Sequence, residues 1–211
     1  MAFSRWGVSV GIALVLLPAS AAAQQQQEVA GVIRRTFISD KRVIGLTSFD
    51  TKLRSGSGLT FGASYGRRLW TSGSALLSLT FEVPVAVNPD EDIHLSVNLV
   101  PSSYSSFFVA PSARVNIFAD QGVSPWLSFG GGFGHFSAAS MLEFGGNNPG
   151  SASSTTGVLQ LGAGFDVRVR GPLSFRFEVR DFDSGAAPVN VNTGNGRQHN
   201  LFVGGGAVWH F

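Results

Sequence analysis

The sequence predicts an all-β protein, an eight-stranded antiparallel up-and-down transmembrane β-barrel. Three observations predict it: apolar and polar residues alternate along about eight segments, long and short connections alternate between them, and charges are few. Of the 211 residues, 44% are hydrophobic and 13% are charged, whereas an ordinary soluble protein carries about 25% charged residues. An outer surface that meets lipid explains this composition better than one that meets water.

The N-terminal segment is predicted to be a signal peptide covering residues 1–23. Arg5 supplies a positive charge, residues 8–17 are apolar, and Ala21 to Ala23 precede Gln24 with small residues that suit cleavage. A retained membrane anchor is the alternative, but this apolar stretch is too short to cross a bilayer of about 30 Å as a helix. We therefore expect export through the Sec pathway and a barrel domain over residues 24–211.

Period-two alternation locates the strands. In the segment 173–180, Leu, Phe, Phe and Val fall on one face, and Ser, Arg, Glu and Arg fall on the other, which is the pattern of a β-strand. Most such segments exceed the 9–11 or so residues that a tilted strand needs to cross a membrane. The least regular is the first, where Arg34 and Arg35 place a charge on each face. The predicted strands are 28–38, 58–70, 75–88, 106–119, 123–137, 155–170, 172–183 and 198–211.

The connections alternate in length, as they do in outer-membrane barrels. The long polar loops are 39–57, 89–105, 138–154 and 184–197. The tight turns are 71–74, 120–122 and 170–172. An even number of strands then places both chain ends on the side of the short turns.

The positions of the charges predict which face of each strand points inward. Seven charged residues occupy the polar faces of the strands, and we expect them to form a charge network in the lumen: Glu82, Arg114, Asp166, Arg168, Arg176, Glu178 and Arg180. Eight strands enclose a lumen that side chains can fill, whereas an Arg facing the bilayer midplane costs about 2–4 kcal/mol. Glycines share this inner face: Gly130, Gly132, Gly134, Gly162, Gly164, Gly204 and Gly206. We expect a plugged interior.

Aromatic residues near the strand ends suggest the girdles that flank a lipid-facing band. The expected girdle on the short-turn side consists of Trp70, Trp126 and Trp209, and the expected opposite belt of Tyr104, Phe107 and Phe136. Ordinary core packing is the alternative for these residues.

The chain ends with a terminal Phe211 preceded by Trp209, Ala207 and Val203 on the same face of the strand. With this tail, the signal peptide and the regular succession of hairpins, the sequence resembles the OmpA/OmpX-like outer-membrane β-barrel family over essentially the whole mature chain. The resemblance implies the bacterial outer membrane, and an assembly signal (Val203, Ala207, Trp209, Phe211) read by the barrel-assembly machinery. It implies little about activity, because members of the family differ mainly in their loops.

No catalytic, cofactor or metal site is expected. Cysteine is absent, the four histidines are scattered, and the near-neutral charge argues against a nucleic-acid binder. One arrangement, His135 and Ser137 with Glu143, is similar to that of membrane-embedded lipid A deacylases, in which a base activates a serine. The chain departs from that pattern at Ala138, where the family has Asn.

Two loop segments allow more than one interpretation. The run from Asn88 to Asp92 is either a solvated acidic turn or a site for a hard cation such as Ca²⁺. The loop 40–54 holds Lys41 and Lys52 and either contacts lipopolysaccharide phosphates or is simply a solvated face.

The function expected from these observations is that of a small closed outer-membrane barrel with a structural or surface-interaction role through its extracellular loops, without catalysis. The expected partners are outer-membrane lipid, lipopolysaccharide and the assembly machinery, and the expected state is a monomer. The alternatives are a lipid-modifying enzyme, a narrow pore, or a secreted lipocalin-like barrel, which would need an apolar inner cavity.

Overall fold

The computed structural model describes residues 26–119, 121–194 and 196–211, so the predicted signal peptide lies outside the described residues. Among those residues, no helix is long and apolar enough to cross a membrane. The barrel strands are β1 (Gln27–Ile38), β4 (Leu59–Thr71), β5 (Leu77–His94), β6 (Ser103–Val109), β7 (Ser112–Ile117), β8 (Val123–Ala138), β9 (Ser153–Arg170), β10 (Leu173–Gly185) and β11 (Arg197–His210). Two short strands lie outside the ring, β2 (Lys41–Arg42) and β3 (Lys52–Ser55).

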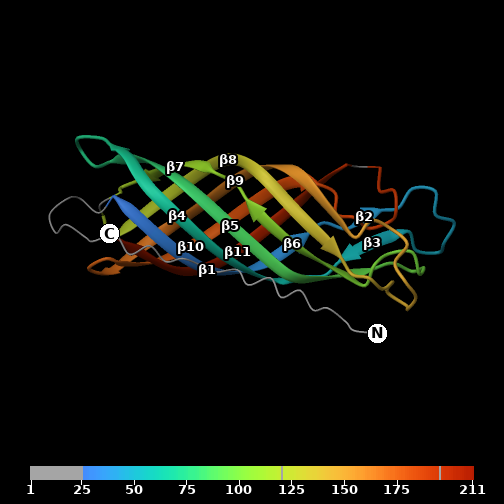
Figure 1. Cartoon of the computed structure of the whole chain (residues 1–211). Coiled ribbons are helices and arrows are strands. Elements are labelled where there is room, and N and C mark those ends of the chain that lie inside the picture. Colours follow the sequence, from blue (N-terminus) through green and yellow to red (C-terminus); the bar gives the residue numbers. More distant parts are fainter. Residues whose placement is uncertain (1–25, 120, 195) are drawn as a thin grey trace, which may run out of the picture.

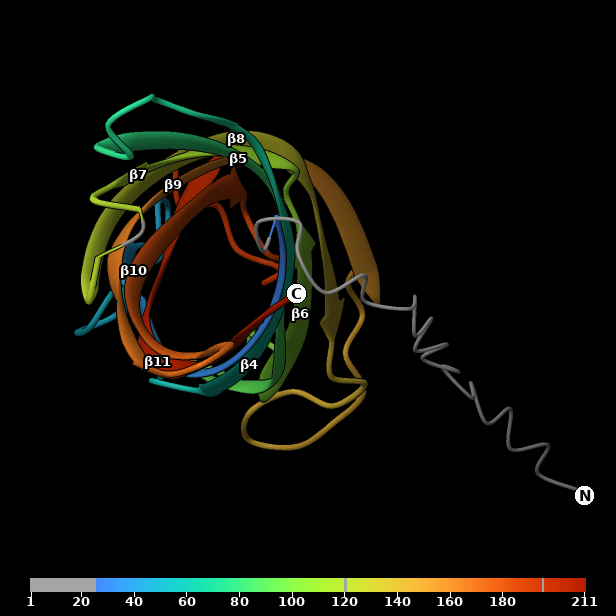
Figure 2. The same cartoon turned by 90° about the vertical axis from the view of Figure 1, so that its left-hand side faces the viewer.

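The strands close into a ring in which every pairing is antiparallel. The order around the ring is β1, β4, β5, β6 with β7, β8, β9, β10 and β11. The ring closes because β1 pairs with β11, from Glu28 opposite His210 to Ile38 opposite Asn200. Strands β6 and β7 share one position, since each pairs with both β5 and β8. The described chain therefore has eight strand positions, as predicted, and Figure 2 shows the ring end-on.

The prediction of one continuous strand over 106–119 is wrong in one respect: the strand is interrupted. It divides into β6 and β7 at Ala110 and Pro111. Proline has no backbone N–H to donate to a neighbouring strand. Ala110 N–H instead donates to the Pro84 carbonyl on β5 at 3.2 Å, so the wall stays hydrogen-bonded at the break.

The two ends of the barrel differ as the connection lengths predicted (Figure 1). One end, the short-turn end, carries the β4–β5 and β9–β10 turns and the C-terminus. Gln27 N–H donates to the Phe211 carbonyl at 3.0 Å, which ties the first strand to the last residue there. The other end, the loop end, carries the four long connections with β2 and β3.

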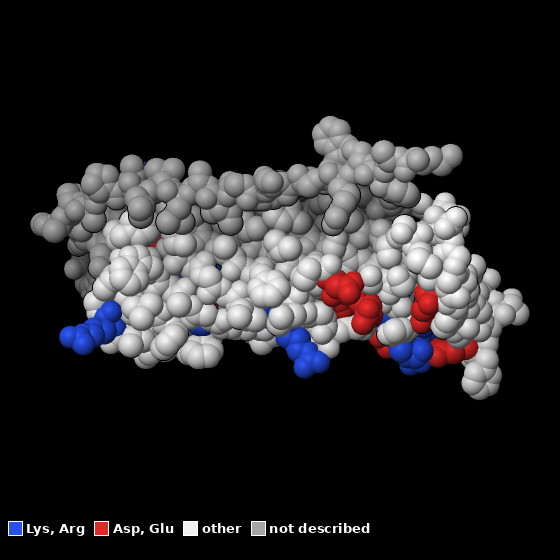
Figure 3. All heavy atoms as spheres, turned by 60° about the horizontal axis from the view of Figure 1, so that its bottom comes forward, with Lys and Arg blue, Asp and Glu red and all other residues white. Residues whose placement is uncertain are grey.

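Apolar side chains face outward and charged ones inward. On β10, Phe175, Phe177 and Val179 are 50%, 51% and 42% exposed, whereas Arg176 and Glu178 are 0% and 3% exposed. This is the reverse of a water-soluble barrel and confirms the predicted orientation; it is also the opposite of what a lipocalin-like barrel requires. On the face seen in Figure 3, few charged groups lie along the wall, and acidic and basic atoms gather toward the loop end.

Candidate functional site

The half of the lumen nearer the short-turn end holds a layer of ion pairs. Glu82 on β5 accepts hydrogen bonds from Arg180 Nη1 at 2.7 Å and from Arg114 Nη1 at 3.2 Å. Arg180 also donates from Nε to Glu178 at 2.9 Å. All four side chains are essentially inaccessible to solvent. Charged side chains from three different strands, β5, β7 and β10, thus neutralise one another inside the ring.

A second set of contacts joins the layer to β9 and β1. Arg176 donates to both carboxylate oxygens of Asp166, from Nε at 2.7 Å and from Nη2 at 2.8 Å. The same Nη2 lies 2.8 Å from Glu28. Arg176 thus forms a bidentate contact with the Asp166 carboxylate, which is the strongest geometry for a guanidinium and a carboxylate.

Sequence reasoning missed two members of the layer, Glu28 and Arg34, both on β1. Arg34 forms a hydrogen-bonded ion pair with Glu178, and Glu28 lies 2.7 Å from Arg114 Nη1. The two residues are six apart and so share one face of the strand, a signal that would have placed Arg34 inward and Arg35 outward. In the described residues the layer thus pairs four arginines with four carboxylates, and we call these eight residues the ionic layer: Glu28, Arg34, Glu82, Arg114, Asp166, Arg176, Glu178 and Arg180.

The prediction that Arg168 belongs to this network is wrong. Arg168 shares the inward face of β9 with Asp166, but it lies one pair nearer the end of the strand and is exposed. The side chain has reached the mouth of the barrel, where solvent replaces the opposite wall.

The prediction that Trp126 belongs to an outer girdle is also wrong. Trp126 is 1% exposed, and its indole N–H donates to Asp166 at 3.3 Å. The guanidinium carbons of Arg114, Arg176 and Arg180 lie 4.9–5.7 Å from the ring centre, within the range of cation–π attraction. Its neighbour Leu127 is exposed, so alternation along β8 turns Trp126 inward. Trp70 and Trp209 are exposed as predicted.

The half of the lumen nearer the loop end contains a cluster of aromatic side chains beside buried polar ones such as Asn88 and Asn200, a division that the sequence did not predict. Phe108, Phe136, Phe182 and Phe202 are fully buried and contact one another at centroid distances of 5.3–5.8 Å. Tyr104 packs on Phe136 at 5.8 Å. Tyr104 and Phe136 are therefore core residues and not members of the predicted outer belt, whereas Phe107 is exposed. We call these five residues the aromatic layer.

The apolar core continues from the aromatic layer into the long loops. Val43, Leu53, Leu95 and Val100 are buried in the same cluster. A polypeptide connection that buries apolar side chains is held in place, because exposing them again costs free energy.

Hydrogen bonds also tie the four loops to one another. Ile44 N–H donates to the Asn192 carbonyl at 2.7 Å, joining the first loop to the fourth. Asn98 joins the second loop to the third, since its Nδ2 donates to the Gly145 carbonyl at 2.8 Å and its Oδ1 accepts from Phe144 N–H at 2.9 Å. The loops thus form a single packed structure, which we call the cap.

Asp50, a charged group of the cap, has a perturbed pKa. Asp50 accepts hydrogen bonds from the Lys52 backbone N–H at 2.9 Å and from Arg54 Nη2 at 2.7 Å. These contacts lower the pKa of the Asp50 carboxyl below its ordinary value, because both favour its charged form.

Close approach of backbones explains why glycines occupy the inner face. A Cβ at Gly206 would overlap the Gly31 carbonyl oxygen and the Val32 backbone, and a Cβ at Gly62 would overlap the Arg34 guanidinium. A side chain at either position would displace a strand or a member of the ionic layer.

Comparisons with solved structures identify this architecture. The structure matches Neisserial surface protein A (NspA) with 15% identity and a TM-score of 0.55, covering 89% of this chain and 98% of NspA. It matches the outer membrane protein OprG of Pseudomonas aeruginosa with 13% identity and a TM-score of 0.56, covering 88% and 96%. The fold is that of an eight-stranded outer-membrane β-barrel. The fold implied by the resemblance to OmpA/OmpX-like proteins is therefore confirmed.

More specific relationships are not found. No protein-family model matches the sequence, and no curated protein sequence matches it. The outer membrane enzyme PagL aligns with 14% identity and a TM-score of 0.44, covering 85% of this chain and 97% of PagL, which is too distant to assign equivalent residues.

The residues of the deacylase-like pattern come only partly together in this outer-membrane barrel. Ser137 Oγ lies 3.4 Å from His135 Nε2, and His135 Nδ1 lies 2.8 Å from Thr155 Oγ1. Glu143 does not orient His135: it accepts from Leu95 N–H at 2.9 Å and lies 3.0 Å from His94 Nδ1. The acidic member of the predicted arrangement is thus part of the cap.

The acidic run from Asn88 to Asp92 does not form a cation cage. Glu91 is buried and accepts hydrogen bonds from Asn88 Nδ2 at 2.7 Å and from Gly58 N–H at 3.1 Å. In the described ranges, no group of three or more acidic, His or Cys residues is arranged to hold a metal ion. In the neighbouring loop, Lys41 Nζ donates to the Arg197 carbonyl at 3.1 Å, whereas Lys52 is exposed.

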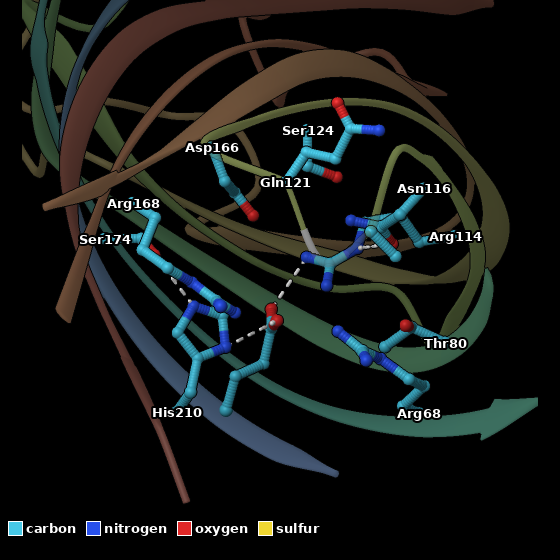
Figure 4. A pocket seen from close by; sticks show the side chains of 12 residues that line it. Arg68, Thr80, Arg114, Asn116, Gln121, Ser124, Asp166, Arg168, Ser174 and His210 are labelled. Atoms are coloured by element: carbon cyan, nitrogen blue, oxygen red, sulfur yellow. Dashed lines mark hydrogen bonds and ion pairs between the residues drawn. The ribbon is translucent and has the colours of Figure 1, made fainter. Parts of the chain in front are cut away.

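A small polar pocket opens at the short-turn end of the lumen, and we call it the short-turn mouth (Figure 4). Figure 4 shows Arg168, Ser174 and His210 on one side of it, with Arg68 and Arg114 on the other. The residues that line it are Glu28, Arg68, Thr80, Arg114, Asn116, Ala119, Gln121, Ser124, Asp166, Arg168, Ser174 and His210. The pocket has a volume of about 20 Å³, and its floor is the end of the ionic layer.

Proposed function

We propose that this protein is a non-conducting barrel of the bacterial outer membrane that presents the cap as an interaction surface on the cell exterior. The short-turn end then faces the periplasm, as in outer-membrane barrels generally. In this proposal the protein binds or supports other surface components and catalyses no reaction.

The observation that carries the proposal is the filling of the lumen. The ionic layer closes the half nearer the short-turn end, and the aromatic layer closes the half nearer the loop end. A hydrated ion would have to break buried ion pairs and then enter an apolar layer, and both steps are unfavourable. Transport through the axis of this barrel is therefore a poor explanation of its function.

The cap supports the second half of the proposal. Its loops are joined by hydrogen bonds and by a buried apolar core, so a partner would not have to order them on binding. Pre-organised surfaces bind with a smaller entropic cost. Phe49 and Phe144 are highly exposed on this structure and are apolar contact points for such a partner.

The outer wall supports the proposed partners of the barrel itself. Val203, Trp209 and Phe211 are exposed, and Ala207 lies on the same outward face of β11. We propose that this face contacts outer-membrane lipid and, before that, serves as the signal to the assembly machinery. Contact of the cap with lipopolysaccharide belongs to the same proposal. Because ring closure leaves no free edge among the barrel strands, we propose a monomer.

Reconstitution into planar lipid bilayers tests the closed lumen. The purified protein is expected to give no stable channel events, whereas a stable conductance in the nanosiemens range would overturn the proposal. A parallel assay of acyl release from lipid A is expected to be negative, and activity that disappears in Ser137→Ala would establish the enzymatic alternative instead.

A further inference from the structure

The ionic layer is balanced in charge, so the arginines beyond it leave the short-turn end positive. In the described residues the layer pairs four arginines with four carboxylates. Outside it, this end of β4 and β9 carries Arg67, Arg68, Arg168 and Arg170. Among the described residues, the acidic side chains at this end, Glu28 and Asp166, belong to the layer. The rim therefore has an excess of positive charge.

Arg168 is the member of this set whose donors are available to a ligand. Its side chain is exposed and forms no hydrogen bond or ion pair within the described part of the chain, whereas its backbone N–H donates to the Gly122 carbonyl at 2.8 Å. By contrast, Arg114 and Arg176, deeper at the same end, are held by carboxylates at 2.7–3.2 Å. The planar guanidinium of an arginine is suited to binding two oxygens of a phosphate or carboxylate at once.

The acidic residues of the pocket do not cancel this charge, because they are already neutralised. Glu28 lies 2.7 Å from Arg114 and 2.8 Å from Arg176. Asp166 receives hydrogen bonds from Arg176 and from the Trp126 indole N–H. Both carboxylates are therefore paired with arginines of the ionic layer, and the second oxygen of Glu28, Oε2, lies 3.8 Å from His210 Nδ1 in the pocket.

The pocket has the size and the donors to accept one atom of an oxyanion. Its volume of about 20 Å³ is close to the space that one water-sized group needs. Ser174 places its hydroxyl on the wall, 3.0 Å from His210 Nε2, and Arg68 stands across from Arg168. The Ser124 hydroxyl donates to the Ile117 carbonyl at 3.0 Å, so Ser174 is the hydroxyl that can donate to an anion when His210 Nε2–H donates to it. A tetrahedral oxyanion could place one oxygen in the cavity and present the others to Arg168 at the open side.

We propose that the short-turn mouth is a binding site for a phosphate-type oxyanion, in which Arg168 supplies the main charged donor. The phosphate group could be carried by a small soluble molecule or by a phospholipid headgroup. This site is separate from the cap, and the proposal stands whether or not the cap binds a partner.

Phosphate titration of the folded barrel in micelles of an amine-oxide detergent, which contains no phosphate, tests the proposal. The indole N–H of Trp126 is a built-in reporter, because it donates to Asp166 in the pocket wall, and its resonance is followed in ¹H–¹⁵N spectra. A saturable shift with inorganic phosphate is expected, and sodium chloride at equal ionic strength should not reproduce it. Loss of a charge-assisted hydrogen bond in Arg168→Gln should weaken phosphate binding about tenfold.

Arg170→Gln is the matched control, because Arg170 lies on the same strand end but does not line the pocket. Its phosphate affinity should stay within about twofold of the parent, since a more distant exposed charge is screened. Equal weakening by the two substitutions would show only a diffuse charged rim and would overturn the site. A shift that does not saturate, or that chloride reproduces, would also overturn it.

The same reporter distinguishes the two sources of phosphate. In phosphatidylcholine nanodiscs, whose headgroups carry phosphate but no net charge, a headgroup ligand would already occupy the mouth and reduce the response to added phosphate relative to the phosphate-free micelles. An equal response in both environments would identify a soluble phosphate compound. Either result, with the loss in Arg168→Gln, supports the site.

Discussion

Replacing Glu82 by glutamine would remove one charge from the centre of the ionic layer. Glu82 is fully buried and accepts three hydrogen bonds, from Arg180 Nη1 at 2.7 Å, Arg180 Nη2 at 3.3 Å and Arg114 Nη1 at 3.2 Å. The amide keeps the size of the side chain but leaves the two arginines one negative charge short. Glu82→Gln therefore isolates the electrostatic contribution from that of packing.

The size of the effect follows from burial and from the remaining partners. Breaking a buried ion pair by removing one partner costs about 3–5 kcal/mol. Arg180 keeps Glu178 at 2.9 Å and Arg114 keeps Glu28 at 2.7 Å, so we expect the lower end, about 3 kcal/mol. Adding Arg180→Gln restores equal numbers of charges and should recover about half of that loss, because the two residues are directly coupled.

Urea unfolding in phospholipid vesicles, followed by tryptophan fluorescence, measures these free energies. Asp183→Asn is the control, because Asp183 pairs with Arg197 at 2.8 Å on the exposed side of the barrel, where such a pair contributes about 0–1 kcal/mol. The reasoning is refuted if Glu82→Gln costs no more than this control, or if the double variant loses the full sum of its single substitutions.

Three further predictions use the same unfolding measurement. Trp126→Phe should cost about 2–3 kcal/mol through the lost indole hydrogen bond and weaker cation–π contacts, whereas the outward Trp209→Phe should cost much less; equal effects would contradict the inward position. Gly206→Ala should destabilise the barrel by about 1–3 kcal/mol or prevent folding, because its Cβ meets the neighbouring backbone, while Gly31→Ala, which points into open space, should be nearly neutral. Phe108→Ala should cost about 3–5 kcal/mol as a cavity in a packed core, and a loss under about 1 kcal/mol would show that the aromatic layer is not packed.

The fold could be predicted from the sequence because a barrel strand repeats every two residues. Along β10, alternation alone distinguishes outward Phe175 and Phe177 from inward Arg176 and Glu178, and the structure confirms both faces. Connection lengths likewise predicted which turns share an end. Both signals are local, so they survive in a single sequence without knowledge of any partner strand.

Which side chains fill the lumen, and which of them pair with one another, could be predicted only in part, because the pairs form across the ring. Arg34 pairs with Glu178 over a separation of 144 residues, and no local pattern links them. Trp126 was misplaced because its distance from the strand end suggested a girdle, although its alternation with Leu127 indicated the interior.

By itself, the sequence determined an eight-stranded barrel with an apolar outer face, since these properties follow from short-range periodicity and composition. Only the tertiary structure decided that the interior is divided into an ionic layer and an aromatic layer, and that the long loops form one cap. The physical reason is ring closure. It sets the height at which each inward side chain meets those of the other strands, and that height determines whether Arg168 reaches solvent or Arg176 reaches a carboxylate.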